Sequence, residues 1–285
     1  MTGFAGILSS RPLDRHETGA LLGAMAQDIT YTSDALVESW ADEYLGVTRV
    51  HHGLLNPEPQ PISNEDGSLS IVMAGEVFDY DAERRWLESQ GHRFRFQQND
   101  AEYCLHLFEE YGAEAFEKLN GSFAILLYDR GKRALLIVTD RVSSHPIYYH
   151  HTQKQLVFGT QLRPLLRFRR LPRRLDERTV FEYFCLGHVL WDHTFYQDVK
   201  ALPPSTVLRF REGGGARVRY WVPEFRDRTE SEDYYVEALA HTLSQAVERK
   251  TRGDHRFGVL LSGGLDSRTV VAAANKPLTA LTIEE

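Results

Sequence analysis

Short apolar runs separated by turn residues fill the first two thirds of the chain, and they constrain its fold more than any other feature. The runs are GFAGIL, YLGVTRV, SLSIVMAGEVF, GSFAILLYD, RALLIVTD, PIYYHH and QLVFGT. Their length and their content of Val, Ile, Phe and Tyr are typical of β-strands. The segment DRGKR joins two of them and contains Gly131, which predicts a hairpin.

Three further segments carry the signals of helices. DYDAERRWLESQGH has Asp81 as its predicted cap and Gly91 as its stop. NDAEYCLHLFEEYG ends at Gly112, and LDERTVFEYFCLG begins at Asp176 and ends at Gly187. Hairpins of buried strands with helices outside them predict an α+β fold, in which two antiparallel sheets are sandwiched between helices.

The character of the chain changes after residue 220. TVLRFREGGGARVRYW predicts a hairpin at its triple glycine, which we expect to close a first domain of residues 1–220. Apolar residues then recur at the spacing of an amphipathic helix that ends at Gly253; they are Val236, Leu239, Leu243 and Val247. A buried strand FGVLL, a glycine loop, a helix and the strand LTALTI follow. This order predicts a second domain, residues 231–285, that begins a parallel α/β sheet.

The composition excludes several classes of protein. The 285 residues are 42% hydrophobic and carry a net charge of −7, so neither a nucleic-acid partner nor a polybasic membrane anchor is expected. The N-terminus lacks a basic segment followed by an apolar run, and no apolar stretch reaches ~18 residues. Cys104 and Cys185 stand in apolar surroundings without metal-ligand spacing, which favours buried structural thiols. We therefore expect a soluble protein of the reducing cytoplasm, with no membrane partner.

Two histidine pairs, His51–His52 and His150–His151, fall on predicted strands. Neighbouring residues of a strand point to opposite faces, so neither pair can bind one metal ion together. We expect these side chains at the surface, with no role as ligands.

The segment RFGVLLSGGLDSRTVVAAA carries the clearest chemical signal. The glycines of SGG let the backbone turn tightly and bring N–H groups to an anion, and the N-terminus of the following helix favours phosphate. The hydroxyls of Ser262 and Ser267 can donate to the same oxygens, and Asp266 can act through Mg²⁺. The loop has neither the lysine of a Walker loop nor the glycine spacing of a dinucleotide-binding loop. A phosphate site is favoured over an ordinary tight turn.

Several motifs, taken in order, resemble the asparagine synthetase family. SGGLDS after a strand resembles the pyrophosphate-binding loop of ATP pyrophosphatases, which split ATP between its α and β phosphates. Before it come AGEVFDY, NDAEY, LNGSFAILLYD, TDRVSSHPIYY, LVFGTQLRPLL and LPPS, so the resemblance covers nearly the whole chain. It implies a class II glutamine amidotransferase domain with the N-terminal-nucleophile-hydrolase fold, a four-layer sandwich. The start of an α/β ATP-pyrophosphatase domain would follow.

The resemblance also implies a set of glutamine-binding residues. Arg49 matches the family's substrate-orienting arginine, and Asp100 matches the aspartate that binds the amino group of glutamine. Gly75 and Glu76 match the last two residues of the family's N-G-E motif. These four positions are the expected glutamine site.

Two positions depart from the family pattern in ways that affect the chemistry. Thr2 replaces the nucleophilic cysteine, and a threonine hydroxyl needs the α-amino group as its base once Met1 is removed. Ala74 replaces the asparagine that donates to the oxyanion, a contribution of roughly 3 kcal/mol. We therefore expect a retained scaffold that has lost its glutaminase activity.

For the second domain the resemblance implies ATP and Mg²⁺. The expected ATP-binding residues are Leu261, Ser262, Gly263, Gly264, Leu265, Asp266 and Ser267, with Ile283 where a backbone group touches adenine. Asp266 would act through the metal ion. The expected substrate is a small-molecule or peptide carboxylate, which is adenylated and then attacked by ammonia or an amine. β-Lactam synthetases and lasso-peptide cyclases, which also lack the nucleophilic cysteine, use an amine of the substrate itself.

The resemblance further implies an incomplete synthetase. The family's later acidic motif and its catalytic basic residues would lie beyond Glu285, so we expect a natural fragment or a truncated chain. The alternative is a non-catalytic regulatory or assembly subunit, either a homodimer or a partner of a complementing synthetase subunit. Intact Ser262, Asp266 and Ser267 favour the ligase, because a pure binding module has no need of them.

Overall fold

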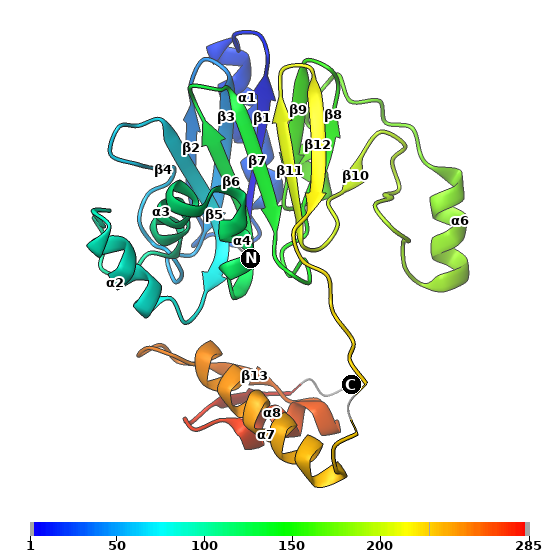
Figure 1. The fold of residues 1–285 in the computed structure, drawn as a ribbon. Coiled ribbons are helices and arrows are strands. Elements are labelled where there is room, and N and C mark those ends of the chain that lie inside the picture. The colour runs from blue at the N-terminus through cyan, green and yellow to red at the C-terminus, as the bar shows by residue number, and fades with distance from the viewer. Residues whose placement is uncertain (1–2, 228, 283–285) are drawn as a thin grey trace. The chain divides into compact units, whose positions relative to one another are not determined.

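The computed structural model describes residues 3–227 and 229–282, which belong to two compact units (Figure 1). The first unit is Met1–Val222 and the second is Pro223–Glu285. Two of the predicted site residues, Thr2 and Ile283, lie outside the described residues.

The first sheet of unit 1 has six antiparallel strands in the order β10-β8-β9-β1-β3-β2. They are β1 (Gly3–Ser9), β2 (Leu36–Ala41), β3 (Leu45–His51), β8 (Tyr148–His151), β9 (Gln155–Gly159) and β10 (Lys200–Ala201). β1 lies inside the sheet between β9 and β3, and all its residues are buried. The chain thus places its first described strand in the core, as the run GFAGIL predicts.

The second sheet also has six antiparallel strands, in the order β12-β11-β7-β6-β5-β4. They are β4 (Ile62–Ser63), β5 (Leu69–Val77), β6 (Gly121–Asp129), β7 (Ala134–Thr139), β11 (Thr206–Arg211) and β12 (Gly214–Arg219). The β6–β7 hairpin closes at the pair Asp129–Ala134, and the β11–β12 hairpin closes at Arg211–Gly214. Both predicted hairpins are confirmed.

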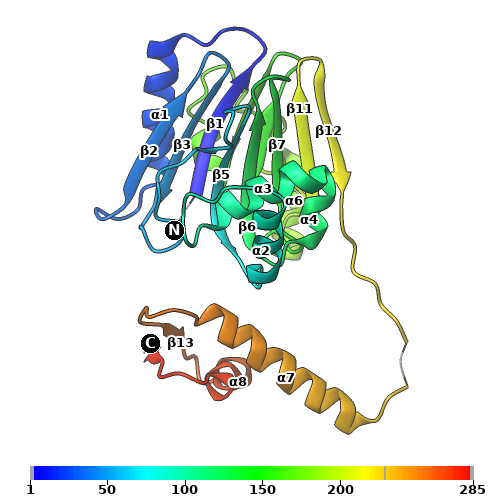
Figure 2. The same ribbon diagram turned by 60° about the vertical axis from the view of Figure 1, so that its left-hand side comes forward.

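Helices cover the outer faces of the two sheets (Figure 2). α1 (Arg15–Ile29) and α5 (Leu162–Leu165) pack on the first sheet. α2 (Asp81–Ser89), α3 (Asp100–Tyr111) and α4 (Ala115–Lys118) pack on the second, and the 3₁₀ turn η1 (Gly112–Glu114) joins the last two. α6 (Glu177–Leu186) lies outside these layers and is largely exposed.

Alternation along the strands distributes the apolar side chains between three parts of the core. Phe4 and Leu8 of β1 lie in the cluster between the two sheets, whereas Ala5 and Ile7 lie in the cluster beneath α1. Leu126 of β6 likewise belongs to the cluster between the sheets, whereas the neighbouring Ile125 belongs to the third cluster, beneath α3. The predicted α+β fold, a four-layer sandwich with two antiparallel sheets between helices, is confirmed.

The helix ends follow the sequence signals at most positions. Asp176 caps α6 by accepting from the Thr179 N–H at 3.2 Å, and Gly187 ends this helix at a φ of 74°. The prediction for α2 is wrong, because Asp81 is its first helical residue and Tyr80 occupies the cap position. Asp81 instead lies in the first turn, where its negative charge faces the positive end of the helix dipole.

Three predictions of burial are wrong. Cys104 is buried as expected, but Cys185 is exposed because it lies on α6, whose neighbouring Phe184 is also exposed. His51 and His150 are buried instead of lying at the surface. One nitrogen of each ring bonds the backbone: His51 Nδ1 accepts a backbone N–H at 3.2 Å, and His150 Nδ1 bonds the Asp198 carbonyl at 2.7 Å. Buried histidines of this kind need no metal ion.

Unit 2 is built from α7 (Glu232–Lys250), β13 (Gly258–Leu260), α8 (Leu265–Ala273) and β14 (Thr279–Leu281). β13 and β14 pair in parallel, with α8 as the connection between them, so the predicted βαβ opening is confirmed. α7 begins at its cap Ser231, whose side chain accepts from the Tyr234 N–H, and ends at Lys250, three residues before Gly253.

The prediction that FGVLL forms a buried strand is wrong in one respect. The strand exists, but Leu260 is 72% exposed, because a two-stranded sheet offers too few neighbours to cover its faces. On α7, Val247 is buried whereas Leu239 of the same apolar stripe is exposed. Within residues 3–227 and 229–282, no helix combines the length and the apolar character needed to cross a membrane.

Candidate functional site

Arg49 lies on β3, between the first strand of the chain and β2. The register pairs Arg49 with Phe4 on one side and with Glu38 on the other. The predicted substrate arginine therefore lies beside Phe4, the second residue of β1. Arg49 is only 4% exposed, so its guanidinium must find partners within the protein.

Those partners are supplied by unit 1 itself. Arg49 Nη1 donates to Glu38 Oε2 at 3.1 Å and to the Glu58 carbonyl at 3.3 Å, and Nη2 donates to the Asn56 carbonyl at 2.7 Å. Burial lowers the pKa of the guanidinium, and the Glu38 carboxylate opposes this shift. The charge of the predicted substrate arginine is thus already paired with an internal carboxylate.

Glu38 is held in this position by two further groups. Its Oε1 lies 3.3 Å from His51 Nε2, and its Oε2 accepts from the Gln60 N–H at 3.2 Å. His51 Nδ1 accepts from the Gly53 N–H, which places the proton of the neutral ring on Nε2, toward Glu38. Burial and the nearby Arg49 charge lower the pKa of His51 and favour this neutral form.

Gly75 lies near the end of β5 at a position that only glycine can occupy. Its φ is +106°, and a Cβ built on it would lie 2.0 Å from the Ser122 carbonyl oxygen of β6. The preceding residue, Ala74, is buried in the apolar cluster between the sheets. Glu76, the next residue, is half-buried.

Asp100 is the first residue of α3, and its carboxylate accepts three hydrogen bonds from internal donors. Oδ1 accepts from the Tyr80 hydroxyl at 2.7 Å, and Oδ2 accepts from the Val77 N–H at 3.0 Å and from Asn56 Nδ2 at 3.4 Å. Burial raises the pKa of Asp100 in spite of these hydrogen bonds. The Tyr80 ring is itself fixed by stacking on Tyr103, with centroids 4.2 Å apart.

Asn56 connects the predicted positions and was missed by the sequence reasoning. Its carbonyl accepts from Arg49, its Nδ2 donates to the Gly75 carbonyl at 3.0 Å, and its Oδ1 accepts from the Asp100 N–H at 2.7 Å. Its φ of 47° is a left-handed value that asparagine tolerates. The one signal in the sequence is its place before Pro57 in LLNPEPQP. We call Arg49, Asn56, Gly75 and Asp100 the arginine–aspartate cluster.

The glycine loop of unit 2 runs from the end of β13 to the start of α8. Gly263 has a φ of +78°, and Gly264 stands at the cap position of α8. The hydroxyls of Ser262 and Ser267 lie 3.3 Å apart, and Ser262 Oγ accepts from the Gly264 N–H at 3.4 Å. Two hydroxyls and the free N–H groups of the helix terminus therefore gather at one point.

The remaining loop residues fit the expected phosphate and metal chemistry. Leu261 is anchored by its N–H to the Leu281 carbonyl at 2.8 Å, and Leu265 begins α8. Asp266 lies in the first turn of α8 with an exposed side chain. Carboxylate oxygens are hard donors, the kind that Mg²⁺ takes together with phosphate oxygens.

Two family models match the chain. Residues 1–221 match the glutamine amidotransferase domain, and residues 238–284 match asparagine synthase. The first match contains the arginine–aspartate cluster and the second contains the glycine loop.

Curated relatives give the same relationship. Asparagine synthetase (glutamine-hydrolyzing) 2 of Bacillus subtilis is 25% identical over 303 residues, which cover 99% of this chain and 40% of the relative. Asparagine synthetase (glutamine-hydrolyzing) 3 of Arabidopsis thaliana is 30% identical, covering 77% of this chain and 33% of the relative. Amidase chry2 of Gibberella zeae is 27% identical, covering 80% and 34%. The chain thus spans well under half the length of these relatives.

A solved structure shares the fold. Glutamine phosphoribosylpyrophosphate amidotransferase from B. subtilis superposes with a TM-score of 0.53 at 13% identity, covering 98% of this chain and 65% of that one. The amidotransferase model alone accounts for far more than half of the residues. The chain therefore belongs to the glutamine amidotransferase domain family, and its later residues match asparagine synthase.

Proposed function

We propose that this chain is part of an ATP-dependent amide-forming ligase of the asparagine synthetase type. The observation that carries the proposal is the glycine loop, where the hydroxyls of Ser262 and Ser267 meet at the N-terminus of α8. Backbone N–H groups there hold the β and γ phosphates of ATP, and Asp266 acts through Mg²⁺, which offsets the phosphate charge. The match of residues 238–284 to asparagine synthase supports this assignment.

The reaction proposed has two steps. A carboxylate oxygen attacks the α-phosphorus of ATP, so that an acyl-adenylate forms and pyrophosphate leaves. Ammonia or an amine then attacks the acyl carbon and displaces AMP. The residues described here hold the pyrophosphate part of ATP in the first step, and the carboxylate substrate is a small molecule or a peptide.

We further propose that unit 1 no longer hydrolyses glutamine. Thr2 and Ala74 stand where the family has its nucleophile and its oxyanion donor. The Arg49–Glu38 pair adds an independent reason, because an arginine neutralised at 3.1 Å by its own protein offers little to a substrate carboxylate. The nitrogen donor is then free ammonia or an amine, not the amide of glutamine.

The ligase proposal is tested by titrating pyrophosphate with Mg²⁺ into the wild-type chain and into Ser262→Ala and Ser267→Ala. Each variant removes one hydroxyl and is expected to weaken binding by about tenfold, the size of one hydrogen bond to a charged group. Ser244→Ala, an exposed serine of α7, is the matched control and should bind as the wild type does. Equal affinity in all four proteins would remove the basis of the proposal.

The glutaminase proposal is tested by ammonia release from glutamine. The wild type is expected to show none, and Thr2→Cys with Ala74→Asn is expected to gain little. Adding Glu38→Gln to this double variant keeps a hydrogen bond to Arg49 but removes the competing negative charge. Glutaminase activity should therefore appear in the triple variant. Turnover by the wild type that Thr2→Ala abolishes would contradict the proposed loss.

A further inference from the structure

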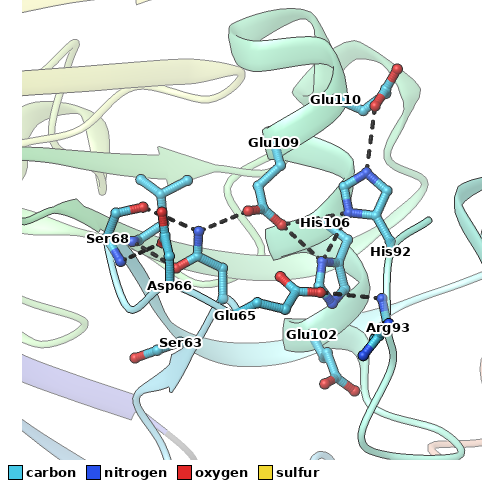
Figure 3. A network of polar contacts seen from close by, with 12 residues as sticks. Ser63, Glu65, Asp66, Ser68, His92, Arg93, Glu102, His106, Glu109 and Glu110 are labelled. Atoms are coloured by element: carbon cyan, nitrogen blue, oxygen red, sulfur yellow. Dashed lines mark hydrogen bonds and ion pairs between the residues drawn. The ribbon is translucent and has the colours of Figure 1, made fainter. Parts of the chain in front are cut away.

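Three side chains of unit 1 outside the arginine–aspartate cluster bring their ligand atoms together (Figure 3). Glu109 Oε2 lies 2.8 Å from His106 Nδ1 and 3.6 Å from His92 Nδ1, and the two ring nitrogens are 3.2 Å apart. In a tetrahedral zinc site with bonds of about 2.0–2.1 Å, ligand atoms lie about 3.4 Å from one another. The observed triangle is close to that size.

The fold builds this triangle from two segments. His106 and Glu109 are three residues apart on α3, so their side chains lie on one face of the helix. His92 comes from the connection between α2 and α3 and approaches the same face. Neither segment holds the three atoms alone, which is why the spacing H-x13-H-x2-E gives no metal signal in the sequence.

The groups behind the three ligand atoms are those that metal sites use to orient their ligands. Asn64 Nδ2 donates to the other oxygen of Glu109 at 2.8 Å, and Glu110 Oε2 lies 3.4 Å from His92 Nε2. A carboxylate on the far nitrogen of a histidine fixes its ring and increases its basicity. In Figure 3 the Glu110 carboxylate lies on the opposite side of the His92 ring from His106 and Glu109.

Burial also suits a bound ion. The side chain of His106 is 3% exposed, whereas those of His92 and Glu109 are 15% and 18% exposed. The cluster is therefore dry enough to strengthen coordination and still open to water on one side. The carboxylates of Glu109 and the nearby Glu110 also bring negative charge to the cluster, which favours a cation.

We propose that His92, His106 and Glu109 bind one Zn²⁺ ion, with a water molecule as the fourth ligand. Two imidazoles and a carboxylate are donors that zinc commonly takes. The bound ion links the α2–α3 connection to α3, the helix whose first residue is Asp100. This inference is independent of the proposed ligase function and of glutamine chemistry.

The test is calorimetric titration of Zn²⁺ into the metal-stripped, tag-free full chain. The wild type should bind one ion per chain, and saturating Zn²⁺ should raise the Tm of unit 1 by about 5 °C. Glu109→Gln and His92→Ala should each lower the affinity by more than about 100-fold. Asn64→Ala, which changes only the support of Glu109, should lower it by about tenfold.

Two controls keep the result interpretable. His241→Ala, an exposed histidine of α7, should bind Zn²⁺ as the wild type does. His92→Ala and Glu109→Gln are the decisive variants, because both side chains are partly exposed and their replacement should leave the fold intact. Circular dichroism checks that both variants fold. Absence of Zn²⁺ binding by the wild type, or binding by both variants as tight as that of the wild type, overturns the proposal. Visible absorption of four-coordinate Co²⁺ in the wild type, lost in Glu109→Gln, would confirm the ligand set.

Discussion

The arginine–aspartate cluster of unit 1 and the glycine loop of unit 2 differ in where their polar groups are satisfied. Arg49 is 4% exposed and donates to Glu38 and two backbone carbonyls. In the loop, the exposed Ser262 Oγ lies 3.3 Å from Ser267 Oγ and accepts from the Gly264 N–H at 3.4 Å, both close to the limit of a hydrogen bond.

This difference is why we propose that the cluster has lost its function in glutamine hydrolysis and that the loop binds phosphate. A buried charge needs a partner, and in unit 1 the Glu38 carboxylate supplies it, so that no buried charge is left unpaired. An exposed loop has no such requirement, since water satisfies its N–H groups until an anion arrives. The polar groups of the cluster are therefore satisfied within the fold, whereas the exposed loop leaves room for the phosphate that we propose it binds.

The largest expected effect is on amide hydrogen exchange. Amides of β6, inside the second sheet, should open only with global unfolding of unit 1, which costs about 5 kcal/mol or more. Amides of α8 and β13 should exchange more than about 1000-fold faster, because Leu260 and its neighbours have little cover. Mass-spectrometric exchange on the monomeric chain measures both. Equal protection in the two units would show that the loop is as firmly held as the cluster.

The next effect concerns Gly75. Gly75→Ala adds a Cβ 2.0 Å from the Ser122 carbonyl at a φ of +106°, so β5 and β6 must separate locally. We expect a loss of about 3 kcal/mol in the free energy of unfolding, or about 10 °C in Tm. Differential scanning calorimetry measures it.

The matched control for this substitution is Gly23→Ala. Gly23 lies on α1 with nothing within 4 Å of the added Cβ, and alanine favours a helix by about 1 kcal/mol. Its Tm should therefore rise slightly. A fall in Tm of the same size in both variants would mean that glycine loss in general, and not the Ser122 contact, is responsible.

The sheets could be predicted from the sequence because apolar alternation and hairpin turns are local signals. β3, β5, β6, β7 and β9 each coincide with a run of Val, Ile, Leu or aromatic residues. Capping worked equally well at Asp176, whose side chain needs only the next turn of α6. The buried strand of unit 2 was mispredicted because burial depends on neighbours that a pattern does not specify.

The site could be predicted only in part, because its decisive contacts depend on strand register. β2 (LVESWA) has no apolar run, so no strand was expected there and Glu38 had no predicted partner. Only the pairing of Glu38 with Arg49 in the folded sheet joins their charges. Asn56 was missed for the same reason, since it meets Gly75 and Asp100 across 19 and 44 residues of sequence.

A smaller effect is expected from Asp28, a second closed ion pair of unit 1. Arg167 donates to both Asp28 oxygens at 2.7 Å, and these hydrogen bonds lower the pKa of Asp28. A carboxyl with a lowered pKa stabilises the fold above its unfolded pKa and loses that contribution as the pH falls through its folded pKa. Asp28→Asn should therefore lower the Tm by a few degrees at pH 7, and the difference should shrink toward pH 3.

The control for Asp28→Asn is Asp254→Asn, the same change of charge at an exposed position of unit 2. At each pH from 7 to 3, the Tm of unit 1 in this variant should equal that of the wild type. A difference between the wild type and Asp28→Asn that stays constant over this range would show that packing, not the ion pair with Arg167, makes the contribution.

The smallest expected effect on stability comes from Gly263→Ala, the counterpart of Gly75→Ala in the open loop. Gly263 also has a positive φ, +78°, but nothing lies within 4 Å of an added Cβ, so only the left-handed backbone is penalised, by about 1 kcal/mol. The Tm of unit 1 should not change, because the loop belongs to the other unit. Pyrophosphate affinity should nevertheless fall by about tenfold or more, since relaxation of the turn moves the N–H groups of the loop away from the anion. Calorimetric titration beside a thermal melt separates the two readouts, and a Tm loss without a loss of pyrophosphate binding would reverse the contrast between the closed cluster and the open loop.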